Sequence, residues 1–160
     1  KAAVGPLAYV PAVLQSLGGG NSIDASITLD DEPSVITSLH SCIVGNCSDL
    51  VGRIPLLPEA RPDDGILDGV VLRAEDVADW AEIGGKLAVD TVRGGINALL
   101  PDELPAREPA RLPRAMQYLE GRRITLEFTE PEHLELDGDG AGAVNAATFV
   151  VMPGTLRVVC

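Results

Sequence analysis

The chain has 160 residues and a formal net charge of −12, with 24 acidic residues against 12 lysines and arginines. A length of this order suits one domain with a real hydrophobic core. The acidic balance argues against a nucleic-acid-binding surface, because phosphate backbones repel acidic faces, so we expect no nucleic-acid partner.

The cysteines and the hydropathy indicate a compartment. The cysteines are Cys42, Cys47 and Cys160, an odd count without a C-x-x-C pair, which supports neither a disulfide framework nor a zinc ribbon. No apolar run approaches the roughly 18 residues that span a bilayer, and no charged-then-apolar leader is present. We therefore expect a soluble, cytoplasmic chain whose membrane contact is peripheral.

The predicted elements begin with a helix. Apolar residues at helical spacing follow Gly5-Pro6 and precede a run of glycines, which predicts a helix over residues 7–17. The period then changes to two, which predicts a first strand from Ala25 to Leu29 and a second from Val35 to Ile43. The acidic segment from Asp30 to Pro33 is typical of the turn between them.

The rest of the chain is predicted to be mostly strand. Further strands are expected at residues 66–72, 124–128, 133–136, 147–152 and 155–159. One helix is predicted to interrupt them. Asp76 caps its start, small and apolar residues recur at helical spacing from Val77 to Ala88, and Arg93 with Gly94-Gly95 marks its end. Segment 100–114 holds four prolines and is predicted to be a surface loop. This order predicts a mainly β fold of the α+β kind, a sandwich or barrel with one or two flanking helices.

The stretch RPDDGILDGVVL, residues 61–72, places Asp63, Asp64 and Gly65 directly before an apolar strand. The D-G dipeptide on its own favours a turn. Alternatively, Asp64 ligates a hard cation beside backbone carbonyls, since magnesium and calcium take oxygen ligands of these kinds. The residues leave both interpretations open.

A second acidic stretch, LELDGDGAG, precedes the C-terminal strands. It is not an EF-hand loop, because the twelfth position, which should be a bidentate glutamate, is Ala146. One interpretation is a hairpin turn at Asp137-Gly138 with solvated carboxylates. The other is that Asp139 is a general base at a strand end, taking a proton from a hydroxyl during phosphoryl transfer.

A cluster of arginines lies between the helix and the later strands. Its members are Arg107, Arg111, Arg114, Arg122 and Arg123. Arginine forks suit phosphate oxygens, so the cluster has the chemistry to face anionic headgroups. A solvated, proline-rich loop that offsets the acidic remainder is the preferred interpretation, and no site is assigned here.

Several short motifs occur together in a fixed order. They are Val44-Gly45-Asn46, Pro58-Glu59-Ala60, Asp64-Gly65-Ile66-Leu67-Asp68, Asp137-Gly138-Asp139 and the run from Pro153 to Val158. In this order and spacing the chain resembles the C-terminal domain of the diacylglycerol kinase-like lipid kinases, which include bacterial diacylglycerol and related lipid kinases as well as sphingosine and ceramide kinases. The resemblance covers nearly the whole chain.

The resemblance implies a fold and a domain organisation. Residues 1–160 would form a single C-terminal β-sandwich domain, incomplete at its N-terminal side, of a two-domain lipid kinase. The family's N-terminal nucleotide-binding domain carries a G-G-D-G-T signature, and that string is absent from this chain. The fragment alone is therefore expected to be inactive, and that missing domain is its expected partner.

The resemblance also implies a reaction and its residues. The enzyme would transfer a phosphoryl group from ATP to the hydroxyl of diacylglycerol or a related lipid at the membrane surface, in lipid metabolism and phospholipid biosynthesis. Asp139 would be the catalytic proton acceptor. Asp64, with the backbone carbonyls of Arg61 and Ile66, would hold a divalent ion such as Mg²⁺. Self-association into a homodimer is left open.

Two departures from the family pattern keep an alternative open. The family usually has glutamate where this chain has Asp139, and the loss of one methylene moves the carboxylate by about 1 Å, a displacement that matters in catalysis. The stretch after Asn46, residues 47–53, has fewer glycines than the family's loop. The alternative is a non-catalytic lipid- or partner-binding β-sandwich module derived from such a kinase.

Overall fold

The computed structural model describes residues 22–50, 54–99 and 113–155. Its elements, in chain order, are β1 (Ile23–Leu29), β2 (Val35–Leu39), β3 (Ser41–Gly45), β4 (Asp49–Leu50), β5 (Ile54–Pro55), β6 (Leu67–Leu72), α2 (Val77–Leu99), β7 (Met116–Gly121), β8 (Arg123–Leu136) and β9 (Asp139–Val150). A four-stranded antiparallel sheet has the order β2-β1-β8-β9, a three-stranded one the order β3-β6-β7, and β4 pairs with β5. The expected mainly β fold is confirmed.

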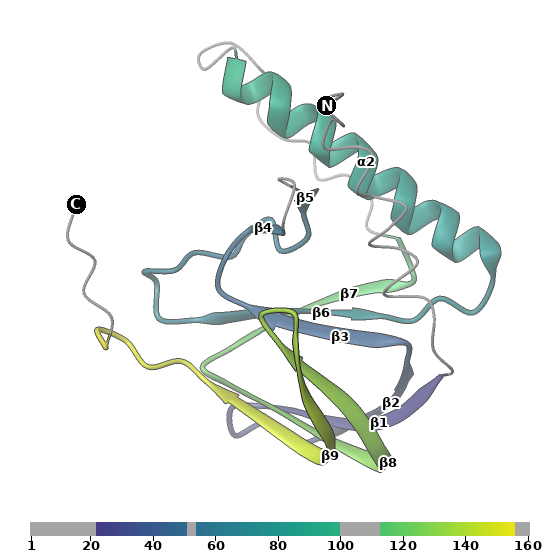
Figure 1. Ribbon diagram of the computed structural model, residues 1–160, viewed down its shortest axis with the longest axis vertical. Helices are drawn as coiled ribbons and strands as arrows, with labels where there is room; N and C mark the ends of the chain where they lie inside the picture. The colour runs from purple at the N-terminus through teal and green to yellow at the C-terminus, as the bar shows by residue number, and fades with distance from the viewer. Residues whose placement is uncertain (1–21, 51–53, 100–112, 156–160) are drawn as a thin grey trace.

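Three layers are stacked in Figure 1, with α2 on one side of the three-stranded sheet and the four-stranded sheet on the other. Strand β6 lies in the middle, and its Val70, Val71 and Leu72 are fully buried. Val71 packs into the core between the two sheets, whereas Val70 and Leu72 pack into the core under α2. Burial on both faces explains why Val70 to Leu72 are consecutive apolar residues instead of an alternating pattern.

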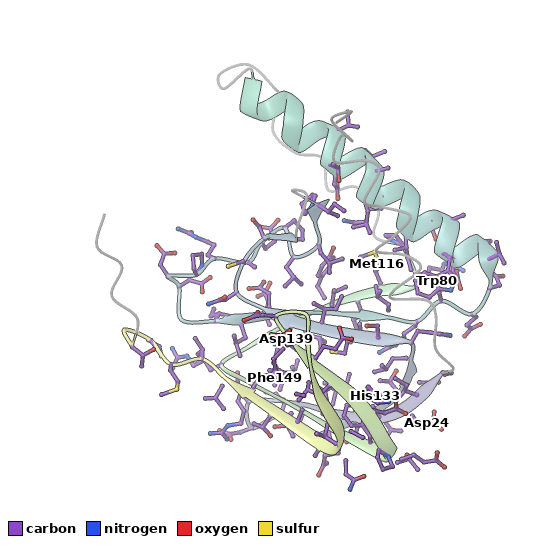
Figure 2. All side chains as sticks on the ribbon, viewed as in Figure 1. Asp24, Trp80, Met116, His133, Asp139 and Phe149 are labelled. Carbon is purple, nitrogen blue, oxygen red and sulfur yellow. The ribbon has the colours of Figure 1, made fainter. Side chains whose placement is uncertain are left out.

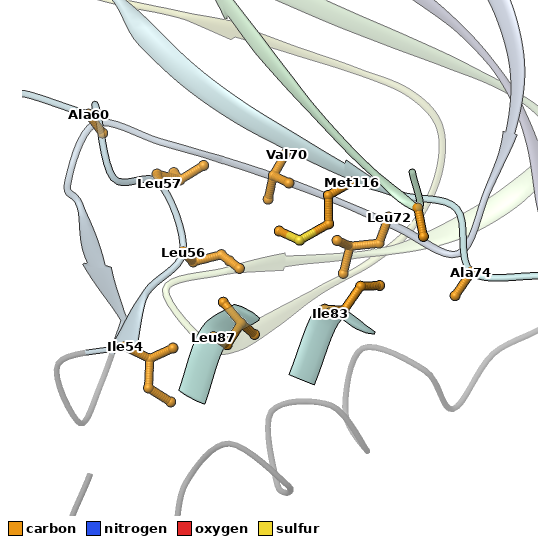
Figure 3. Close-up of a cluster of buried hydrophobic side chains, with 11 residues drawn as sticks. Ile54, Leu56, Leu57, Ala60, Val70, Leu72, Ala74, Ile83, Leu87 and Met116 are labelled. Atoms are coloured by element: carbon orange, nitrogen blue, oxygen red, sulfur yellow. The ribbon is translucent and has the colours of Figure 1, made fainter. Parts of the chain in front are cut away.

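The core under α2 joins the helix to the three-stranded sheet (Figure 3). Ile83 and Leu87 of the helix pack with Leu56 and Met116. Trp80 lies at the rim of this core, with its ring edge-on to His40 at a centroid distance of 5.9 Å. The helix thereby covers the face of the sheet that points away from β1 and β8.

The predicted start of the helix is confirmed and its predicted end is wrong. Asp76 Oδ1 accepts hydrogen bonds from the backbone N–H groups of Ala78 at 2.8 Å and Asp79 at 3.0 Å, as an N-cap should. However, α2 runs past Gly94-Gly95 to Leu99. A glycine costs a helix only about 1 kcal/mol relative to alanine, so the pair weakens the helix without ending it.

The segment predicted as one strand from Val35 to Ile43 is two strands in different sheets. The chain leaves β2 after Leu39 and enters β3 at Ser41. Between them the backbone N–H of His40 donates a 2.8 Å hydrogen bond to the carbonyl of Leu72, which ties the crossing point to β6. An alternating apolar pattern continues across the crossing, so periodicity could not reveal it.

The C-terminal strands were predicted in pieces. The segments expected at 124–128 and 133–136 form the single strand β8, and the strand expected at 147–152 is β9, which begins at Asp139. A register shift between Glu127 and Glu132 interrupts the apolar alternation and explains the apparent break. The glycine- and alanine-rich start of β9 has low strand propensity and is held by its pairing with β8.

Two strand regions were not predicted from the sequence, and some predictions lie outside the described residues. Strand β7 was missed because Met116 and Leu119 face different cores, which hides any alternation. The β4-β5 pair was missed because each strand has two residues. The helix predicted at 7–17 lies outside the described residues, as do all but Thr155 of the strand predicted at 155–159 and nearly all of the loop predicted at 100–114. Within the described ranges, no helix is long and apolar enough to cross a bilayer.

A buried ion pair within α2 also contacts β7. Lys86 Nζ lies 2.7 Å from Asp90 Oδ2, with the two side chains 8% and 11% exposed. The same ammonium donates a 3.3 Å hydrogen bond to Tyr118 Oη and lies 5.7 Å from the centre of its ring. If either partner were removed, the remaining charge would be buried and poorly hydrated.

We expect Lys86→Met to lower the free energy of unfolding by about 3–5 kcal/mol, because it strands a buried carboxylate. Urea unfolding of the chain measures this change. The double variant Lys86→Met/Asp90→Leu, which removes both charges, should recover much of the loss. A cost below about 1 kcal/mol for the single variant, typical of exposed pairs, would contradict the assignment.

Candidate functional site

The Asp63-Asp64-Gly65 segment forms a tight turn that leads into β6. Asp64 Oδ1 accepts a 2.9 Å hydrogen bond from the backbone N–H of Ile66, the local bond that turn aspartates favour. Gly65 has φ of 77°, which disfavours a side chain. The turn interpretation is thus correct for the backbone, and it leaves both carboxylates exposed.

Several of the sequence motifs converge around this turn. Gly45, the glycine of V-G-N, is the β3 partner of Asp68 in β6. A Cβ at position 45 would lie 3.3 Å from Leu57 Cδ1, so this position has little room for a side chain. A Cβ at position 65 would lie 3.6 Å from Pro153 Cγ, so the P-G motif contacts the D-G motif. The fold therefore brings V-G-N, D-G-I-L-D and P-G together.

A surface hollow of about 790 Å³ opens beside the turn. Its walls come from three turns and the end of β9, and they are lined by Asp30, Asp31, Asp63, Asp64, Gly65, Arg122, Arg123, Val150, Val151 and Pro153. We call this the Asp64 hollow. Four aspartates and two arginines line it, so the hollow is polar, with carboxylates in excess and an apolar edge.

The basic wall of the hollow is held by Asp30. Its Oδ1 accepts hydrogen bonds from the backbone N–H groups of Arg122 and Arg123, both at 2.8 Å, and its own N–H donates to the carbonyl of Arg123 at 2.8 Å. Among the described residues, neither guanidinium forms an ion pair. The sequence predicted a solvated loop here. The pairing of β1 with β8 brings these turns together, and a contact between segments so far apart in sequence leaves no local pattern.

A buried carboxyl group lies behind the turn. Asp68 is 7% exposed, and its neighbour across the β6–β7 ladder is Glu120. Burial raises the pKa of Asp68, and the negative charges of Glu120, Asp64 and Glu59 raise it further. Asp68 is the last residue of the D-G-I-L-D motif, and only the folded chain shows that it is buried among carboxylates.

The predicted base, Asp139, lies elsewhere on the molecule. Leu136 pairs with Asp139 across a two-residue turn, Asp137-Gly138, with φ of 52° and 89°. Two positive φ values are the mark of a type I′ hairpin turn, so the hairpin prediction is correct. Figure 2 shows Asp139 near this turn. The Asp64 hollow borders the other end of the hairpin, where Arg123 pairs with Val150.

Asp139 and Asp64 therefore do not line one recess. Asp139 is exposed, and its carboxylate has no hydrogen-bond or ion-pair partner within the described residues. A carboxylate in this setting can accept a proton from a hydroxyl that approaches it.

The candidate ligands at Asp64 are oxygen atoms, which are the ligands that hard cations take. No group of three or more His, Cys, Asp or Glu side chains is arranged to hold a metal in residues 22–50, 54–99 and 113–155. Any cation at Asp64 must then rely on main-chain oxygens, and Arg61 and Ile66 flank the turn. Mg²⁺ and Ca²⁺ accept such carbonyl ligands. The excess of carboxylates in the hollow is the charge that a divalent ion would reduce.

Three solved structures share this fold. Two are of a candidate diacylglycerol kinase from Bacillus anthracis str. Sterne, with TM-scores of 0.55 and 0.59 at 17% and 16% identity. The third is of a diacylglycerol kinase from the same organism, with a TM-score of 0.52 at 17% identity. Each match covers 92% of this chain but only 42–48% of the solved chain.

These matches confirm that the chain has the fold expected from its motifs, and the chain spans less than half the length of the solved chains. No protein-family model matches the sequence, and no curated protein matches it. The likeness is therefore one of fold.

The raised pKa of Asp68 predicts a pH dependence of stability. The ionised carboxylate is disfavoured in the folded state, so this group stabilises the fold most below its ordinary pKa of 3.8, and that contribution is lost as the pH rises through the folded value. Asp68→Asn imitates the protonated form. We expect it to raise the melting temperature at neutral pH and to lose this advantage toward about pH 3.

Thermal unfolding in EDTA across this pH range measures the effect. Asp63→Asn is the matched control, because that exposed carboxylate should give a flat difference. An Asp68→Asn variant that is less stable than the parent chain at neutral pH would contradict the electrostatic account.

Proposed function

We propose that this chain is the C-terminal part of an ATP-dependent lipid kinase that phosphorylates the hydroxyl of diacylglycerol or a related lipid. The observation that carries the proposal is the joint agreement of fold and motif order. The fold matches diacylglycerol kinase structures over 92% of the chain, and the V-G-N, D-G-I-L-D and P-G motifs meet around one turn. Neither feature alone would suffice, because a fold by itself does not specify a reaction.

Asp139 is the proposed proton acceptor. As the lipid oxygen forms a bond to the γ-phosphorus of ATP, the bond from that phosphorus to the bridging oxygen breaks, ADP leaves, and the hydroxyl proton passes to the Asp139 carboxylate. A hairpin end suits this task, because the carboxylate is exposed and projects from a paired strand. ATP itself would be bound by the family's N-terminal domain, and Asp139 would face that domain.

Asp64 is the proposed cation ligand, together with the carbonyl oxygens of Arg61 and Ile66. A bound Mg²⁺ would neutralise part of the negative charge around the turn. The position of Asp64 at the opposite end of the hairpin from Asp139 favours a stabilising role for this ion over contact with the reacting hydroxyl. Asp64 also orders the turn through its hydrogen bond to Ile66, with or without the ion.

The work of such an enzyme lies at the cytoplasmic membrane surface, in phospholipid biosynthesis. The net charge of −12 gives this part of the protein no general attraction to anionic lipid. Membrane contact would therefore be local and peripheral, and would depend on particular surfaces of the longer protein.

A non-catalytic lipid- or partner-binding module is the second candidate. The observation in its favour is that Asp139 has no described partner that positions its side chain, and aspartate is shorter than the family's usual glutamate. Such a module would keep the fold without phosphoryl transfer, with Asp64 and Asp139 as turn residues only. The following two experiments separate these functions.

In the longer protein that includes a nucleotide-binding domain, we expect Asp139→Asn to lower phosphoryl transfer to diacylglycerol by at least 10²-fold, the scale of a lost general base. Asp137→Asn is the matched control, because asparagine tolerates the positive φ of that turn position and keeps the hairpin. Asp139→Glu should retain activity. Full activity in Asp139→Asn would remove the catalytic assignment.

Mg²⁺ or Ca²⁺ should raise the free energy of unfolding of this chain by about 2.7 kcal/mol when the ion is at a hundred times its dissociation constant. The melting temperature should rise with it. Asp64→Asn should abolish the effect while it keeps an oxygen for the Ile66 N–H, and Asp63→Asn should preserve it. Equal ion dependence in Asp64→Asn and the parent chain would exclude Asp64 as a ligand.

A further inference from the structure

The distal end of the β8–β9 hairpin combines an exposed leucine with the Asp139 carboxylate. Leu136 and Asp139 are directly opposed residues of the antiparallel pair. Such partners point to the same face of the ladder, with Cβ atoms about 5 Å apart. Leu136 is 52% exposed. An apolar side chain and an unpaired carboxylate therefore lie next to each other on one face.

The apolar surface continues along β8 from this point. Leu134 is two residues earlier on the strand and shares the face of Leu136. Its partner in β9 is Gly142, which offers no side chain to cover it. Gly142 has φ of 95° and follows the register shift between Leu134 and Glu135, so a bulge in β9 sets this arrangement.

The same end of the hairpin is open to a ligand. A Cβ at position 138, 140 or 142 would have no described atom within 4 Å. Gly142 leaves β9 without a side chain opposite Leu134, and Gly138 leaves the adjacent turn without one. An approaching molecule can therefore contact Leu134 and Leu136 without displacing side chains from the opposite strand.

Exposed leucines are common on protein surfaces, and one alone has no functional meaning. Leu136 differs because it lies beside a carboxylate that has no partner among the described residues. A carboxylate next to an apolar strip complements an alcohol with an alkyl body, because the hydroxyl can donate to the oxygen while the alkyl part leaves water.

We propose that Leu136, supported by Leu134, is a substrate-contact residue that binds the apolar part of the lipid alcohol whose hydroxyl faces Asp139. This inference rests on the proposed lipid kinase function and deepens it, because it locates the preference for long-chain alcohols at the hairpin end. Leu136 takes no part in proton transfer. It determines which alcohols are held where that transfer occurs.

The test compares two substrates in the longer protein, dioleoylglycerol in mixed micelles and water-soluble dibutyrylglycerol. We expect Leu136→Ser to lower kcat/KM for dioleoylglycerol about tenfold, equivalent to roughly 1.4 kcal/mol, mainly through KM. The change for dibutyrylglycerol should stay below about twofold, because little apolar surface is lost from contact. Leu136→Met should restore the parent values.

Ile36→Ser is the matched control. Ile36 is 84% exposed on β2, an edge strand on the opposite side of the four-stranded sheet from β9, so its loss should leave both substrates unaffected. The melting temperature of Leu136→Ser should remain near that of the parent protein, which separates lost contact from lost folding.

The outcomes distinguish the two proposals. Activity in the parent protein with equal losses for both substrates in Leu136→Ser, or no loss, would overturn the contact role and leave the kinase proposal intact. Equal losses together with a lowered melting temperature would show that another part of the protein covers Leu136. Absence of phosphoryl transfer in the parent, or full activity in Asp139→Asn, would overturn the proposed function and this inference with it.

Discussion

The burial of β6 on both faces is the constraint on which the rest of the structure depends. Val71 belongs to the core between the sheets, while Val70 and Leu72 belong to the core under α2. Because the two cores share one strand, neither layer can shift without moving it. The Asp63-Asp64-Gly65 turn leads directly into this strand, so packing on both faces of the strand also fixes the position of the turn. Asp68 takes part in the same burial, and its raised pKa is the electrostatic consequence.

The β8–β9 hairpin connects the two acidic regions. Its first pair, Arg123 and Val150, lines the Asp64 hollow, and its last pair, Leu136 and Asp139, lies at the type I′ turn. The register shifts change its direction and decide which side chains share a face. In the proposed kinase, the hairpin would separate a cation site that stabilises the fold from a carboxylate that accepts the proton. This arrangement assigns different roles to two stretches that look alike in sequence.

Part of this structure could be predicted from the sequence, where local chemistry decides. The Asp76 cap, the Asp137-Gly138 hairpin turn and the apolar run of β6 each depend on residues within a few positions. The crossing between sheets at His40 was not predictable, because it is tied to β6 by a tertiary hydrogen bond to Leu72. The continuation of α2 past Gly94-Gly95 was missed because a glycine pair weakens a helix without ending it.

The candidate site could likewise be predicted only where local motifs define it. The D-D-G turn and the D-G-D hairpin were found from their motifs. The basic wall of the hollow was not found, because Asp30 meets Arg122 and Arg123 only after β1 pairs with β8, about 90 residues later. The burial of Asp68 beside Glu120 was hidden for the same reason, since β7 gave no alternating signal.

The central claim is that this chain supplies the lipid-hydroxyl side of a kinase whose nucleotide side lies in another domain. The most direct test measures transfer of labelled phosphate from ATP to diacylglycerol in mixed micelles, with the longer two-domain protein and the 160-residue chain assayed side by side. The account predicts labelled lipid from the longer protein and none from the chain alone. No transfer from either, across several lipid alcohols, would contradict the claim and favour a binding module that has the fold without the reaction.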